Sequence, residues 1–140
     1  MNKPALRLDA VVKLRETEED RARIQLAEAH RQVEAATRAA AAARARARED
    51  SRRSGNAAEW QLAESAHFQA LREASQADHA AAAAGEKLST TRQHYNSAYK
   101  RAEGIRRVAE SRRAELIAEA ELAERKQLDE VGVLMYRRAS

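Results

Sequence analysis

The chain has 140 residues, of which 44% are hydrophobic, 34% charged and 4% aromatic, with one proline, four glycines and no cysteine. So few large apolar side chains disfavour a globular core and with it a cofactor-dependent enzyme, and the lack of cysteine excludes disulfides and thiolate metal sites. The formal net charge of +4 permits contact with an anionic surface without requiring it. The abundance of alanine, arginine and glutamate is typical of a long helix or a coiled coil.

The first predicted element is a helix over about residues 5–52. Pro4 lies where a helix can begin, because a proline in the first turn loses no intrahelical hydrogen bond. A spacing of three and four residues selects Leu8, Val12, Arg15, Glu19, Ala22, Leu26, Ala29, Val33, Ala36, Ala40, Ala43 and Ala47. Ten of these twelve residues are apolar, and this narrow period predicts one side of a coiled-coil seam.

A turn is predicted at about residues 53–57. Residues 51–56 read Ser-Arg-Arg-Ser-Gly-Asn and form the one interior cluster of turn-forming residues. Gly55 can adopt a left-handed backbone conformation at low cost. The chain is therefore expected to reverse its direction here.

The second predicted element is a helix over about residues 58–138. Its apolar stripe passes through Trp60, Ala63, His67, Ala70, Ala74, Ala77, Ala81, Ala84, Leu88, Thr91, Tyr95, Ala98, Ala102, Ile105 and Ala109. Gly85 and Gly104 lack turn-forming neighbours, so they are expected to weaken the helix locally without ending it. Beyond Ala109 the same spacing of three and four residues falls largely on charged residues, as at a stutter in a coiled coil.

These elements predict an all-α fold, an antiparallel two-helix coiled-coil hairpin with a longer C-terminal helix, forming a single domain over residues 1–140. Centred on Gly55, the hairpin pairs residues whose numbers add up to roughly 110, for example Ala47 with Ala63 and Leu8 with Ala102. The first helix then ends opposite Ala109. About 30 residues, or on the order of 45 Å of helix, continue without a partner, and we interpret them as a binding element.

Three stretches resemble the FliJ family of flagellar export proteins, which includes the stalk proteins of related type III secretion systems. Residues 6–15 read Leu-Arg-Leu-Asp-Ala-Val-Val-Lys-Leu-Arg and are followed by acidic residues, as in the family's first helix. Trp60, Phe68 and Leu71 are similar to an aromatic and aliphatic patch of the family. Residues 124–130 match its Glu-x-Lys-x-Leu-Asp-Glu signature.

The resemblance implies a non-enzymatic stalk without a cofactor, serving protein transport and motility. Family members insert in the pore of a hexameric export ATPase, link it to a membrane-embedded export gate and handle export chaperones. Carried over to this chain, the residues that bind the ATPase are Leu122, Arg125, Lys126, Leu128, Asp129, Glu130 and Leu134. Those that bind the gate or the chaperones are Trp60, Phe68 and Leu71. The expected location is the cytoplasm, with peripheral association at the inner face of the membrane.

Simpler interpretations of both surfaces remain open. Trp60, Phe68 and Leu71 could cap the open end of the seam. Residues 126–130 could be a solvated helix end, and the apolar residues within 131–136 could pack back onto the first turn of the first helix. The Tyr95–Tyr99 pair is most simply explained by packing.

The functional alternatives are the stalk of a virulence-type secretion system, a generic coiled-coil scaffold and a basic nucleoid-associated protein. The arginines between residues 44 and 53 scatter around the helix axis and have no interleaved aromatic residue, so no nucleic-acid partner is expected. A second basic region spans residues 100–113 and could meet an acidic partner or membrane surface. His30, His67, His79 and His94 are too dispersed to bind a metal ion.

Overall fold

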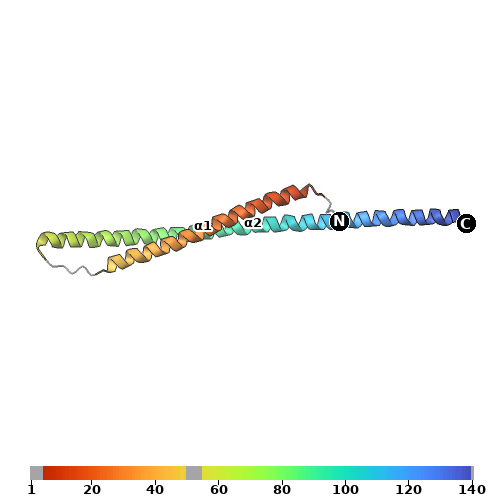
Figure 1. The fold of residues 1–140 in the computed structure, drawn as a ribbon. Helices are drawn as coiled ribbons and strands as arrows, with labels where there is room; N and C mark the ends of the chain where they lie inside the picture. The colour runs from red at the N-terminus through yellow and green to blue at the C-terminus, as the bar shows by residue number, and fades with distance from the viewer. Residues whose placement is uncertain (1–4, 50–54, 140) are drawn as a thin grey trace. The chain divides into compact units, whose positions relative to one another are not determined.

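The computed structural model describes residues 5–49 and 55–139 of the chain. It contains helix α1, Leu8–Arg48, and helix α2, Ala57–Ala139. The two helices pack against each other (Figure 1), and the described residues include no strand. The predicted all-α helical hairpin is therefore confirmed.

Local hydrogen bonds satisfy backbone groups at the start of each helix. The Asp9 carboxylate accepts a hydrogen bond of 3.1 Å from the Leu6 N–H, and the Leu6 carbonyl accepts one of 3.1 Å from the Asp9 N–H. At the start of α2, the Asn56 side-chain oxygen accepts a bond of 3.0 Å from the Glu59 N–H. Asn56 is thus the N-cap of α2.

The predicted turn coincides in part with residues 50–54, which lie outside the described residues. Of the remainder, Gly55 has a φ of 124°, in the region that favours glycine. Gly85 and Gly104 lie inside α2, which continues through both without a break.

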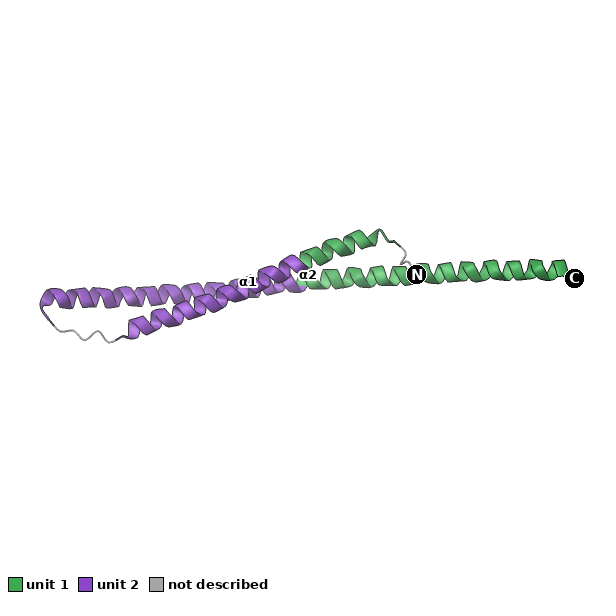
Figure 2. Cartoon of the chain, in the orientation of Figure 1, with its two compact units in different colours: residues 1–19, 97–140 green, residues 20–96 purple. Residues whose placement is uncertain are grey.

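The chain forms two compact units (Figure 2), each described here by itself. Unit 2 comprises residues 20–96, and its core is a cluster of buried Ala43, Ala47 and Ala74 with partly buried alanines packed against it. An ion pair of 3.0 Å joins Arg44 of α1 to Asp78 of α2 on its surface. Small side chains in the core let the two helices approach closely.

Unit 1 comprises residues 1–19 and 97–140. Its buried residues are Ala102, Ala109 and, unusually, Glu19, which is 4% exposed. Arg106 of α2 forms ion pairs with Glu16 and Glu19 of α1, and Arg113 forms one of 2.6 Å with Asp9. Charge therefore contributes to the contact between the helices in this unit.

The seam positions were predicted almost completely. All twelve predicted positions of α1 are buried or partly buried, and so are fourteen of the fifteen in α2. Trp60 is the exception, because it is exposed. The period of the sequence thus identifies which face of each helix packs.

The predicted register was wrong. Within unit 1, Asp9 pairs with Arg113, and within unit 2, Arg44 pairs with Asp78, so the numbers of paired residues add up to about 120 and not 110. The prediction assumed a tight turn centred on Gly55. However, a stripe of alanines fits equally well at registers that differ by whole turns, so the stripe could not reveal the error.

Candidate partner-binding surfaces

Residues 114–139 of α2, called the C-terminal segment below, extend beyond the last ion pair with α1. Arg113 contacts Asp9 in the first turns of α1. From Arg113 to Ala139, α2 continues for about 40 Å at 1.5 Å per residue. No other described helix accompanies this segment within unit 1 (Figure 2). Every residue from Ile117 to Ala139 is exposed.

The C-terminal segment exposes an unusual number of large apolar side chains. Eight of them are between 41% and 77% exposed. They are Ile117, Leu122, Leu128, Val131, Val133, Leu134, Met135 and Tyr136. Packing of residues 131–136 onto α1 is not observed in unit 1, so a solvent-exposed apolar surface is available here for a partner.

These apolar side chains fall on two nearly opposite faces of the helix. At about 100° per residue, one face carries Leu128, Val131, Leu134 and Met135. The second face carries Leu122, Val133 and Tyr136, roughly 160° away from the first. We call them the Leu128 face and the Leu122 face. A partner that forms a single groove would cover only one of them.

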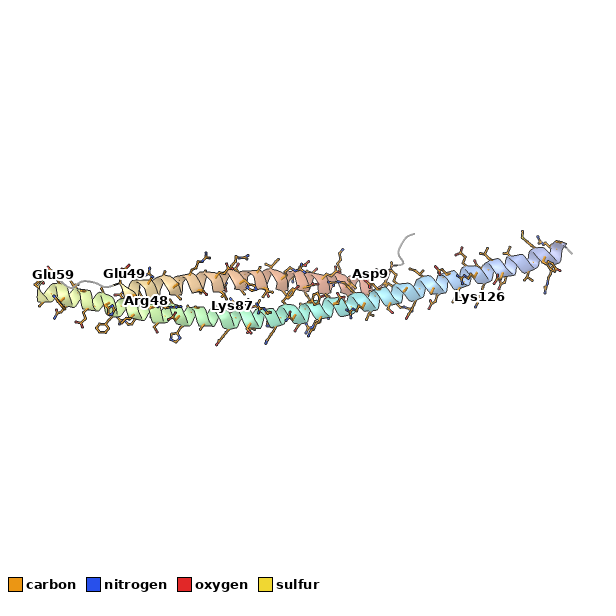
Figure 3. The ribbon with its side chains drawn as sticks, turned by 90° about the horizontal axis from the view of Figure 1, so that it is seen from below. Asp9, Arg48, Glu49, Glu59, Lys87 and Lys126 are labelled. Carbon is orange, nitrogen blue, oxygen red and sulfur yellow. The ribbon has the colours of Figure 1, made fainter. Side chains whose placement is uncertain are left out.

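The charges of the segment alternate in bands along the helix. An acidic band holds Glu119, Glu121 and Glu124, followed by the basic pair Arg125 and Lys126. A second acidic band, Asp129 and Glu130, and a basic end, Arg137 and Arg138, complete the series. Figure 3 shows Lys126 on the segment.

The predicted ATPase-binding residues all lie on this exposed segment. Leu128 and Leu134 belong to the Leu128 face, and Leu122 belongs to the opposite one. At about 100° per residue, Asp129 lies on the Leu122 face and Lys126 lies at its edge, whereas Arg125 and Glu130 lie between the two faces. All four are exposed. The prediction did not include Val133, Met135 and Tyr136, although the dense apolar run at residues 131–136 was a signal for them.

Trp60, Phe68 and Leu71, called the Trp60 patch below, lie near the start of α2 in unit 2. They are between 45% and 56% exposed. Trp60 and Leu71 are eleven residues apart and share one face, with Phe68 about 60° from Leu71. The ring of Phe68 lies 6.3 Å from that of the partly buried His67. Half of this apolar surface therefore remains accessible to a partner.

The third feature is a charged layer between the helices of unit 1, consisting of Glu16, Glu19, Glu103 and Arg106. The Arg106 guanidinium donates hydrogen bonds of 2.6 Å to Glu19, 2.7 Å to Glu103 and 3.2 Å to Glu16. Burial disfavours the charged guanidinium, but the hydrogen bond to Glu16 and the charges of Glu19 and Glu103 raise the pKa of Arg106 above its ordinary value. Arg106 is therefore charged throughout the ordinary pH range.

The periodicity of the sequence does not predict this layer, because it shows Glu19 only as one of two polar residues in the apolar stripe. Its partner Arg106 is 87 residues away in the chain, so the pattern of either helix alone could not identify the pair.

Residues 5–49 and 55–139 contain no metal-binding cluster and no helix that could cross a membrane. No group of three or more histidine, aspartate or glutamate side chains is placed there to hold a metal ion. In the same part of the chain, neither helix has a stretch apolar enough to cross a membrane.

Two packed helices, one of which continues alone with exposed apolar faces, define a helical hairpin with an extended C-terminal helix. The family model described as the flagellar FliJ protein matches residues 4–140. The chain therefore belongs to the FliJ family, and its role is related to flagellar protein export. Comparison with curated proteins and with solved structures gave no significant match.

Proposed function

We propose that this protein is a non-enzymatic stalk and chaperone component of the flagellar type III export apparatus. The C-terminal segment inserts in the ring of the hexameric export ATPase. The Trp60 patch contacts the export gate or the export chaperones. The protein acts in the cytoplasm, in peripheral association with the inner face of the cell membrane.

The two opposite apolar faces of the C-terminal segment are the observation that carries this proposal. A helix that lies in a groove needs one apolar stripe, since its outer side stays in water. A helix surrounded by subunits is contacted on all sides, so apolar side chains on both faces are buried. The exposure of the Leu128 and Leu122 faces in the isolated chain supports a partner of this enclosing kind.

The alternating charge bands suit the same environment. Exposed ion pairs are weak individually and contribute more to orientation and association rate than to affinity. A segment that meets several ring subunits in turn is held by many such contacts without being fixed to one subunit. Arg125 and Lys126, between two acidic bands, would position the segment along the axis of the ring.

The ATPase contact is tested by changing each face separately. Leu128→Ala/Met135→Ala alters the Leu128 face and Leu122→Ala/Val133→Ala alters the Leu122 face. Each pair removes apolar area that the ring would bury, so each should lower the stimulation of the export ATPase about tenfold or more. Ile24→Ala, which changes an exposed residue of α1, is the control and should leave stimulation intact.

An effect confined to one face would contradict enclosure and indicate a groove. Unchanged stimulation in both variants would exclude the segment as the ATPase contact. Circular dichroism should show the same helix content in all variants, because alanine is a good helix former.

The second contact is tested on the Trp60 patch. Phe68→Ala/Leu71→Ala should reduce capture of the purified export gate domain or of the export chaperones, while ATPase stimulation stays normal. Leu62→Ala changes an exposed residue on another face of α2 and is the matched control. Equal binding by the patch variant and the control would argue that the patch has only a structural role.

A further inference from the structure

The alanine seam alone does not determine the register of the two helices. All eight buried apolar residues in the described chain are alanines. If α1 slid by seven residues along α2, about 10 Å, each seam position would again face a seam position. Ala47, for example, would face Ala81 or His67. Such a repeat of small side chains specifies register weakly.

The charged layer distinguishes between these registers. In the observed register, Arg106 contacts Glu16 and Glu19 of α1. Sliding in one direction would replace these two residues by Asp9 and Val12, and the buried Glu19 would face Tyr99. Glu19 would lose its 2.6 Å ion pair with Arg106, which is costly for a carboxylate this buried.

Sliding in the other direction would replace them by Arg23 and Leu26. Glu19 would then meet Arg113, but Arg106 would face the like charge of Arg23. The observed register is therefore the one in which Arg106 and Arg113 both face carboxylates of α1, with Asp9 as the partner of Arg113.

We propose that the charged layer, together with the Asp9–Arg113 pair, fixes the register of this hairpin and so determines where the C-terminal segment begins. Burial of one ionic group at an otherwise apolar seam selects one alignment among several that apolar packing allows. Without the layer, the hairpin also populates registers slid by seven residues. The free part of α2 then lengthens or shortens by about 10 Å.

The absence of cysteine from the chain makes disulfide mapping a direct test. Three cysteine pairs within unit 1 report three registers. Val12→Cys with Ala109→Cys reports the observed register. Val12→Cys with Ala102→Cys or with Leu116→Cys reports the two registers slid by seven residues. Each pair is oxidised in the otherwise unchanged chain and in the variant Glu19→Ala/Arg106→Ala/Arg113→Ala, which removes both the charged layer and the Asp9–Arg113 pair.

In the unchanged chain, only the first pair should form a disulfide in high yield. In the variant, the ratio of slid to native disulfide should rise about tenfold or more, because only the registry-specifying charges have been removed. The matched control is Arg112→Ala/Glu115→Ala, which removes an exposed ion pair within α2. This control should keep the pattern of the unchanged chain.

Two outcomes would overturn the proposal. In the first, the native disulfide remains dominant in the variant. In the second, all three disulfides form in equally low yield and circular dichroism shows a loss of helix content. This result would show that the layer contributes only stability.

Discussion

Among the described residues, the buried side chains are eight alanines and one glutamate. Each alanine removes little apolar area from water, so stability must be distributed along the whole seam. The close approach of the helices also leaves little room for larger side chains. Each alanine of the seam therefore contributes little to the free energy of unfolding, but replacing it by a larger side chain can be harmful.

A larger side chain in the seam should destabilise the hairpin. Ala40 and Ala102 are 0% exposed, so Ala40→Leu or Ala102→Leu would push the helices apart and cost about 1–3 kcal/mol. Thermal unfolding followed by circular dichroism should show a lower Tm for both. Ala80→Leu, at an exposed position, is the control, and an equal Tm in all three variants would contradict the observed packing.

The two partners of the buried ion pair should respond differently to truncation. Arg106→Ala removes a 2.6 Å ion pair from the buried Glu19 carboxylate, whereas Glu19→Ala removes one of three carboxylate partners from the more exposed Arg106. Removing one partner of a buried pair is most harmful when the remaining charge is buried. The Tm of Arg106→Ala should therefore fall further than that of Glu19→Ala, and the reverse order would show that Glu19 is solvated.

At the residue scale, the sequence predicted which residues face the seam but not that one of them, Glu19, forms a buried ion pair across it. Periodicity treated Glu19 as a polar exception in an apolar stripe. Its burial depends on Arg106, which only the pairing of the two helices brings near. A distant ionic partner cannot be identified until the register is known.

At the scale of the elements, the glycines of α2 are sites where the helix can be strengthened. A Cβ atom added at Gly85 or Gly104 would meet no atom within 4 Å. Gly85→Ala and Gly104→Ala should each stabilise the hairpin by about 1 kcal/mol, because alanine loses less backbone entropy in a helix. Chemical denaturation should show higher midpoints for both.

Gly55 should behave in the opposite way. Its φ of 124° is strained for any residue with a Cβ atom. Gly55→Ala should lower the denaturation midpoint in the same experiment, and a gain in stability would show that this backbone conformation is not required.

The existence and extent of both helices followed from composition, periodicity and the scarcity of helix breakers. The Asn56 cap was also readable in principle, since Asn56 and Glu59 have the spacing of an N-terminal capping sequence. The register of the two helices could not be predicted in this way. Repeated alanines fit several registers, and the sequence indicates only where the chain can turn.

At the scale of the whole molecule, the two proposed binding surfaces belong to different units. The C-terminal segment is part of unit 1 and the Trp60 patch is part of unit 2. The predicted contact residues of the two surfaces lie at least 50 residues apart in the chain and are proposed to bind different partners, and the effects of independent sites usually add. Combining Phe68→Ala/Leu71→Ala with Leu128→Ala/Met135→Ala should therefore reduce gate or chaperone capture and ATPase stimulation by the same factors as the separate variants.

The sequence predicted an unpartnered C-terminal helix because the apolar stripe of α2 ends where α1 has no more residues to offer. The resemblance to the FliJ family then suggested the export ATPase as the partner of this helix. The two-faced distribution of apolar residues became informative only with the structure, which places both faces in solvent.

Amide hydrogen exchange of residues 117–139 tests the central claim most directly, measured on the isolated chain and after addition of the export ATPase. A single helix without tertiary contacts opens readily, so the account predicts faster exchange here than in residues 97–113, and marked slowing once the ATPase is present. Strong protection in the isolated chain, or exchange that the ATPase leaves unchanged, would contradict it.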